Sequence, residues 1–245
     1  MSRLNKSGID YLTHTWNFYT GCHNHTKGIC KVGNNCYAKK QIERFEKVYP
    51  NGFEPTFYYD SFLLPLLEKR PERIGIGFLG DLFGDWVDPD KPIELPEHRY
   101  SLWLNGDCSL RNTLFAIIKK CPQHTFVFLT KCYWNLPKWG KFPDNCWVGM
   151  TNCGGFEDLS EMMKVQAKVR FVSYEPMYDY TKPDLRYINW VIIGGQTRPN
   201  KLPNMANVND LVNECDKLSI PVFLKENLRN GIRFEYKLRQ EFPKI

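Results

Sequence analysis

Short apolar runs recur along the chain and alternate with longer stretches in which apolar and polar residues are mixed. The runs are rich in Val, Ile, Phe or Trp and are apolar at nearly consecutive positions; they cover residues 74–79, 125–129, 146–150, 169–173, 189–193 and 221–224. Continuous apolar runs of this length are typical of strands that are covered on both faces by helices. The pattern therefore predicts a parallel β-sheet.

The stretches between these runs can form the helices that such a sheet needs. The expected helices cover residues 37–48, 111–120, 156–168 and 207–218, and a further strand is expected at 14–17. About seven strands that alternate with about six helices favour an α/β fold, a single-domain partial or irregular (β/α) TIM-like barrel over residues 1–245. An open doubly wound sheet is the alternative, because the order of the strands does not follow from the sequence.

The composition of the chain bears on the location of the protein, the use of its cysteines and its possible partners. The chain has 245 residues, of which 42% are hydrophobic, but it lacks an apolar leader and any run of about 18 apolar residues that could span a membrane. We therefore expect a cytoplasmic protein without a membrane partner. The nine cysteines then favour metal or cluster ligation over disulfides. The net charge of +6 allows a nucleic-acid partner without requiring one.

Polar and glycine residues follow the predicted strands at their carboxyl ends. In a barrel these ends meet on one face, where active sites are built from several loops at once. Turn formation and helix capping are the alternative explanation for each loop taken alone. The residues in question are Gly80-Asp81, Thr130-Lys131, Thr151-Asn152, Glu175-Pro176, Gly194-Gly195-Gln196 and Lys225-Glu226-Asn227.

Three cysteines lie in a glycine-rich loop, residues 21–38, directly after the first predicted strand. Three thiolates from Cys22, Cys30 and Cys36 on a [4Fe–4S] cluster would leave one iron open to an external ligand. That arrangement is needed to bind and cleave S-adenosylmethionine. Structural zinc is the competing interpretation, with His23 or His25 as a fourth ligand.

The chain resembles a widespread bacterial and phage family of radical S-adenosylmethionine-like proteins. The family signature has the form TWN(P)xxGC, then a glycine-cysteine pair, then CYA. Here it reads TWNFYTGC, GIC and CYAKK, followed in family order by FLGDLFGDWV, FVFLTK, WVGMTN, RFVSYEPM, INWVIIGGQT and PVFLKEN. The sequence departs from the signature at Phe18, where a proline is usual. Its cysteines are also widely spaced, because seven residues separate the first two and five separate the last two.

The resemblance implies a radical-type barrel with an amino-terminal cluster and a cofactor that lies across the carboxyl ends of the strands. By analogy with related enzymes, Tyr37 is expected near the cofactor's adenine, and Gly80 and Asp81 near its amino group. Helix capping is the alternative role for Asp81. The remaining candidates for contacts with the cofactor are Lys131, Asn152, Glu175, Gly194, Gly195, Gln196 and Lys225.

Two of these candidate groups also have plain structural explanations. Lys131 and Lys225 could bind the carboxylate of the cofactor or a substrate phosphate, or could be solvated surface lysines. Glu175 could hold a ribose hydroxyl or a substrate amine, or could form a buried ion pair with Lys131.

The resulting functional hypothesis is a radical S-adenosylmethionine enzyme that generates a 5′-deoxyadenosyl radical. We expect it to receive electrons from a donor such as a flavodoxin or ferredoxin, and to act on a nucleic acid or nucleotide. A zinc-stabilised nucleic-acid-binding module without catalysis is one alternative. A hydrolase or lyase that uses Asp81, Glu175 and Lys131 as acid–base groups is another.

Overall fold

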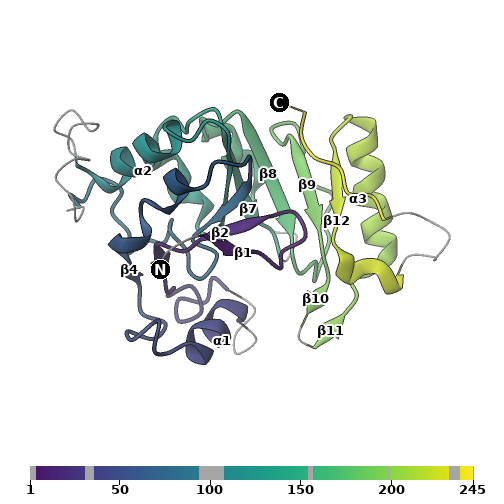
Figure 1. Cartoon of the computed structure of the whole chain (residues 1–245). Coiled ribbons are helices and arrows are strands. Elements are labelled where there is room, and N and C mark those ends of the chain that lie inside the picture. The colour runs from purple at the N-terminus through teal and green to yellow at the C-terminus, as the bar shows by residue number, and fades with distance from the viewer. Residues whose placement is uncertain are drawn as a thin grey trace. The chain divides into compact units, whose positions relative to one another are not determined.

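The computed structural model describes residues 4–30, 36–93, 108–153, 157–197, 199–231 and 238–244. Its strands are β1 (Asn5–Lys6), β2 (His14–Trp16), β3 (Tyr19–Thr20), β4 (Thr56–Phe57), β5 (Arg73–Ile76), β6 (Thr125–Thr130), β7 (Cys146–Thr151), β8 (Val169–Tyr174), β9 (Trp190–Ile193), β10 (Gln196–Thr197), β11 (Asn200–Lys201) and β12 (Val222–Leu224). Its α-helices are α1 (Tyr37–Arg44), α2 (Leu110–Lys119) and α3 (Met205–Lys217), and short 3₁₀ helices cover Tyr59–Ser61, Leu64–Leu67, Tyr133–Trp139, Leu159–Lys164 and Glu226–Gly231. Figure 1 shows these elements along the chain.

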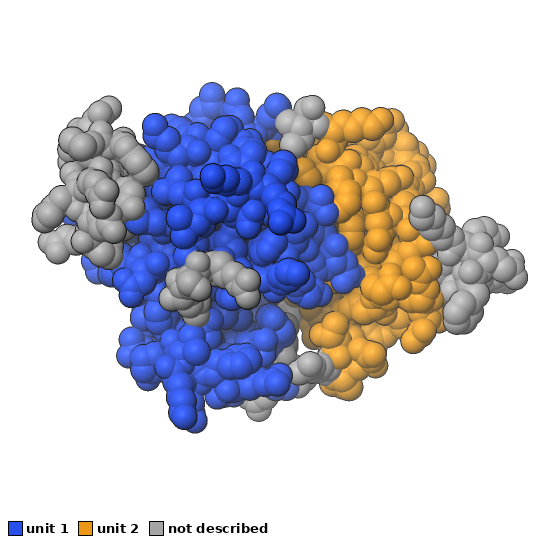
Figure 2. All heavy atoms as spheres, viewed as in Figure 1, with its two compact units in different colours: residues 1–146, 166–168 blue, residues 147–165, 169–245 orange. Residues whose placement is uncertain are grey.

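The chain divides into two compact units, which Figure 2 distinguishes by colour. Unit 1 comprises residues 1–146 and 166–168, and unit 2 comprises residues 147–165 and 169–245. In unit 1 the strand order is β1-β2-β5-β6, and only the β1 edge is antiparallel. In unit 2 the order is β7-β8-β9-β12, and the pairs β7–β8, β8–β9 and β9–β12 are all parallel.

The prediction of a parallel α/β sheet is thus confirmed, whereas closure into a barrel is not. In each unit these four strands are mostly parallel, and neither set of four is closed as a barrel. Within each set, the strands lie side by side in the order in which they occur along the chain, so neither unit shows the reversal of order that a doubly wound sheet has. Central strands are buried along their length, as their continuous apolar runs require.

Two of the helices follow from clear sequence signals. Ser109 caps α2 by accepting a hydrogen bond from the backbone N–H of Asn112, and the Asn204 side chain caps α3 in the same way through Ala206. On α3 the buried residues are Val208, Leu211 and Cys215, at the spacing of one helix face.

The helix expected at 156–168 is instead a short 3₁₀ helix over Leu159–Lys164, and residue 156 lies outside the described part of the chain. Its buried side chains, Leu159 and Met162, are three residues apart, a spacing that one 3₁₀ turn also satisfies.

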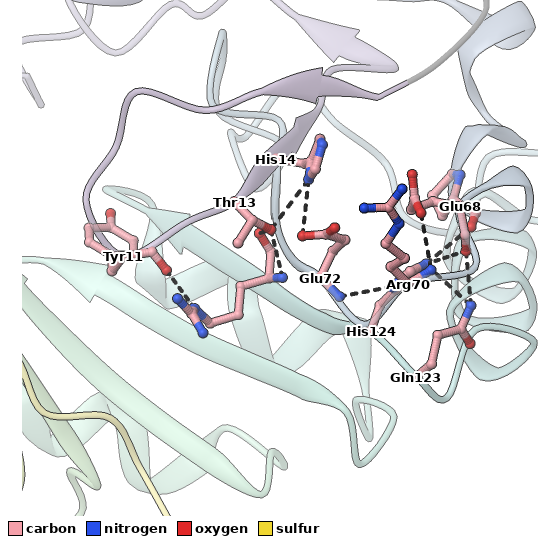
Figure 3. Close-up of polar contacts among 10 residues, drawn as sticks. Tyr11, Thr13, His14, Glu68, Arg70, Glu72, Gln123 and His124 are labelled. Atoms are coloured by element: carbon pink, nitrogen blue, oxygen red, sulfur yellow. Dashed lines mark hydrogen bonds and ion pairs between the residues drawn. The ribbon is translucent and has the colours of Figure 1, made fainter.

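The amino ends of the strands in unit 1 are tied together by polar contacts, several of which Figure 3 shows. The Thr13 hydroxyl accepts a hydrogen bond from the Arg73 backbone N–H and donates one to the Arg73 carbonyl, at 2.9 and 3.0 Å. His124 is buried, and its Nδ1 accepts from the Glu72 N–H at 3.3 Å while its Nε2 lies 3.0 Å from the Glu68 carbonyl oxygen. These contacts fix the strands at one end and leave their carboxyl ends to carry the candidate site.

Candidate functional site

The cysteine loop starts where two glycines bring its backbone against the end of β5. The Gly21 N–H donates to the Leu79 carbonyl at 3.0 Å, and the Asp81 N–H donates to the Gly21 carbonyl at 3.3 Å. Gly21 has a φ of 86°, and a Cβ on Gly80 would collide with the backbone of Gly21. Both positions therefore need glycine, Gly21 for its backbone conformation and Gly80 for the close approach of two main chains.

The three candidate ligands Cys22, Cys30 and Cys36 are free and half-buried. Burial raises the pKa of Cys22 from 9.0 to about 12, with smaller contributions from the negative charges of Asp81, Cys30 and Cys36. The Cys22 thiol therefore lies within electrostatic range of both Cys30 and Cys36. The backbone N–H of Asn24 donates to the Cys22 sulfur at 3.3 Å, the kind of contact that stabilises a metal-bound thiolate.

The thiols do not form a completed ligand set. Over the described ranges, which omit residues 31–35 between the second and third cysteine, no group of three or more His, Cys, Asp or Glu side chains is arranged to hold a metal ion. The two histidines considered as zinc ligands contact other groups. His23 Nε2 lies 3.6 Å from a carboxylate oxygen of Glu54, and the His25 ring packs near Phe53.

Asp81 is the most highly connected polar residue of the site. It is 4% exposed, and each carboxylate oxygen accepts two hydrogen bonds. Oδ1 accepts from the Thr130 hydroxyl at 2.6 Å and the Phe83 N–H at 3.2 Å. Oδ2 accepts from the Asn24 amide at 2.7 Å and the Lys131 N–H at 3.1 Å. Because a carboxylate has about four acceptor positions, protein donors occupy all of them.

Asn24 connects Asp81 to a fourth thiol, and neither residue of this link was predicted from the sequence as part of the site. The buried Cys132 thiol donates to the Asn24 side-chain oxygen at 3.0 Å, and the Cys132 N–H donates to the Thr130 hydroxyl at 2.8 Å. Burial also raises the pKa of Cys132 well above its usual range, so this thiol is neutral and can donate. Asn24, Asp81, Thr130 and Cys132 form one buried hydrogen-bonded network, called the Asp81 network below.

The other residues predicted in unit 1, Lys131 and Tyr37, differ in their relation to this network. Lys131 contributes its backbone N–H to Asp81, and Tyr37 is the exposed first residue of α1. Asp85 accepts from Asn135 and Trp134, and these two hydrogen bonds lower its pKa.

Trp86 binds a neighbouring aromatic side chain in the same unit. Its indole N–H donates to the Tyr19 hydroxyl at 2.7 Å, and burial raises the pKa of Tyr19.

Unit 2 holds a second group of predicted residues at the carboxyl ends of β8, β9 and β12. Lys225 forms an ion pair with Glu175, so the partner of Glu175 in the described structure is Lys225 rather than Lys131. Both side chains of the ion pair pack against Gly194. A Cβ at this position would lie 3.0 Å from the Lys225 side chain and 3.4 Å from that of Glu175. Asn227 holds the next peptide, because it accepts from the Gly195 N–H at 3.1 Å and donates to the Gly195 carbonyl at 2.7 Å.

The last two predicted residues of unit 2 have backbone roles. Asn152 is 2% exposed, and its N–H donates to the Ser173 carbonyl at 2.9 Å. Gln196 belongs to β10 and pairs with Lys201 of β11.

Comparison with known proteins identifies the family. The family model described as "Protein of unknown function (DUF5131)" matches residues 6–95 and 106–231. No curated protein and no solved structure matches the chain. Among the described residues, no helix is both long and apolar enough to cross a membrane. Because the match extends over most of its length, the chain belongs to the DUF5131 family.

Proposed function

We propose that this protein is a radical S-adenosylmethionine enzyme in which Cys22, Cys30 and Cys36 hold a [4Fe–4S] cluster. The observation that carries the proposal is that one loop holds three free, half-buried cysteines, of which Cys22 lies beside the end of β5 and is influenced electrostatically by the other two. The donor set suits the group, since thiolates are the usual protein ligands of such clusters and three of them leave one iron open. The N–H of Asn24 already points at the sulfur of Cys22.

When bound, the cluster supplies the electron that cleaves S-adenosylmethionine to a 5′-deoxyadenosyl radical. The protein's own residues hold the ligand loop. Gly21 and Gly80 bring the loop onto β5, and Asp81 fixes it through Asn24. Asp81 therefore acts as a positioning residue, because protein donors already fill its acceptor positions and it has none for the ammonium group of a cofactor.

Glu175 and Lys225 of unit 2 are proposed to contact the cofactor for a different reason from the residues of the cysteine loop. A Glu175–Lys225 pair is neutral overall and presents one acceptor and one donor side by side. Those two groups complement the ammonium and carboxylate of an amino acid, such as the methionine part of S-adenosylmethionine. We include a flavodoxin or ferredoxin as electron donor and a nucleic acid or nucleotide as substrate in the same proposal.

The cluster is tested on protein purified without oxygen, by measuring iron, sulfide and zinc together with the visible absorption spectrum. We expect about four irons per chain and a broad visible band, both lost when Cys22, Cys30 and Cys36 are replaced by Ala. Cys108→Ala is the matched control, since among the other cysteines it alone shares their half-buried setting. One zinc per chain and no colour after reconstitution would refute the radical mechanism and support the zinc module.

The proposed contact between Lys225 and the cofactor is tested by a separate measurement. Lys225→Met is expected to weaken binding of S-adenosylmethionine at least tenfold, measured by calorimetry, and to leave the iron content unchanged. Equal binding by the variant and the wild-type chain would remove Lys225 from the proposed cofactor site.

A further inference from the structure

The cysteine loop and α1 carry an excess of positive charge. Residues 21–48 contain six basic residues (Lys27, Lys31, Lys39, Lys40, Arg44 and Lys47) and two acidic ones (Glu43 and Glu46), a net charge of +4. This short segment therefore attracts anions.

Within this segment, three basic side chains are exposed on α1 and in the turn that follows it, and they are called the basic stripe below. Ile42 is the single buried residue of the helix. Lys40 and Arg44 are exposed, and their i, i+4 spacing puts them on the helix face opposite Ile42. Lys47 is exposed in the turn after the helix.

Two exposed aromatic rings flank the basic stripe. Tyr37 is 55% exposed and Phe45 is 45% exposed, and the Arg44 guanidinium lies 5.4 Å from the centre of the Phe45 ring. Basic groups that track a backbone, together with exposed aromatic rings on which bases stack, are the recurring elements of surfaces that bind single-stranded nucleic acid.

Helix α1 packs onto the segment that leads into the candidate site. Ile42 packs against Tyr49 and Leu79, and Leu79 directly precedes Gly80 and Asp81. A strand held on the outer face of α1 would therefore be bound to the helix that directly follows Cys36 of the cysteine loop.

We propose that α1 and its following turn form a binding surface for single-stranded nucleic acid, with Lys40, Arg44 and Lys47 on the phosphates and Tyr37 and Phe45 under the bases. Binding itself is independent of the cluster. The claim that the bound strand is the substrate rests on the proposed radical function.

The test is fluorescence anisotropy with a labelled single-stranded oligodeoxynucleotide of about 20 nucleotides, at about 50 to 200 mM salt. The variant is Lys40→Gln/Arg44→Gln. Because each phosphate contact on a single strand contributes about 0.7 to the slope of log K against log salt, the slope should fall in magnitude by about 1.4. Affinity at about 50 mM salt should fall roughly tenfold or more.

Two further variants separate specific contacts from overall charge. Lys119→Gln/Lys120→Gln removes the same charge from exposed positions at the end of α2, and should retain nearly wild-type affinity. Tyr37→Ala should weaken binding by about fivefold or more at every salt concentration, since stacking is not an ionic contact.

The proposal is overturned if the wild-type chain does not bind the oligonucleotide, or if the α1 and α2 variants lose affinity equally. Binding to vesicles of phosphatidylserine without binding to the oligonucleotide would also overturn it, and would point to a membrane surface. The assay uses the chain without reductant or S-adenosylmethionine, and the variant that lacks all three loop cysteines should still bind. A failed cluster and a failed binding surface therefore give different results.

Discussion

Asp81→Asn tests the role of the Asp81 network by replacing one carboxylate oxygen with an amide NH₂. The native side chain accepts hydrogen bonds from four donors, two on each oxygen. In the variant, the NH₂ group must face one of these two pairs. The Thr130 side is preferred, because the Thr130 hydroxyl can rotate to accept a hydrogen bond. The Phe83 N–H then loses its acceptor, and the three remaining bonds lose their charge assistance.

The expected loss of stability follows from those changes. A buried N–H without a partner costs about 1–3 kcal/mol, and hydrogen bonds to a charged group are worth about 1.5–3 kcal/mol against about 1 for neutral ones. We expect the free energy of unfolding to fall by about 2–4 kcal/mol. In a chain of this size each kcal/mol corresponds to about 2–4 °C in Tm, so the variant should melt several degrees lower.

The assay is urea and thermal unfolding of metal-free protein, followed by circular dichroism. Asp85→Asn is the matched control, since its side chain is 42% exposed and its loss should cost about 1 kcal/mol or less. If Asp81→Asn loses no more stability than this control, the four-donor arrangement is not what holds the loop. Reconstituted Asp81→Asn should also bind less iron than wild type, because Asn24 is no longer fixed beside Cys22.

Three further outcomes follow from the same contacts. The raised pKa of Cys22 predicts that its contribution to the stability of metal-free protein is complete below pH 9.0 and is lost as the pH rises toward about 12; urea midpoints across this range should fall less steeply in Cys22→Ala. Gly80→Ala should reduce both stability and iron content because its Cβ meets backbone, whereas Gly8→Ala, with open space around it, should change neither. Lys225→Met should destabilise the chain more than Lys225→Met/Glu175→Gln, since the double variant leaves no unpaired charge; additive losses in a double-mutant cycle would contradict the ion pair.

The strands were predictable because their signal is local. Buried parallel strands such as β7 and β9 need apolar side chains on both faces, so they can be recognised in the sequence as runs of consecutive apolar residues. Closure of the sheet was not predictable, because it depends on twist and on pairing between distant segments. The extent of α1 was overestimated, since Phe45 leaves the helical conformation and its N–H bonds to the carbonyls of both Gln41 and Ile42.

The candidate site was predictable only in part, for a similar reason. Glycines and acidic residues that directly follow a strand are a local signal, and this signal identifies Gly80, Asp81 and Glu175. Asn24 and Thr130 are separated from Asp81 by 57 and 49 residues, so their hydrogen bonds arise only when the chain has folded. The partner of Glu175 was missed because two lysines end strands, and the sequence does not rank them.

The sparse burial of α1, in which only Ile42 is fully buried, has a consequence for how the proposed cluster would assemble. One Ile side chain contributes about 1.5–3 kcal/mol by burial, which is small beside the global stability of a domain. The helix can therefore detach and dock again by local unfolding while the sheet of unit 1 stays folded. Cys36, which directly precedes this helix, would separate from Cys22 and return with each such excursion. Under the proposed function, iron and sulfide would thus enter a chain that has already folded, and assembly of the cluster would follow folding rather than drive it.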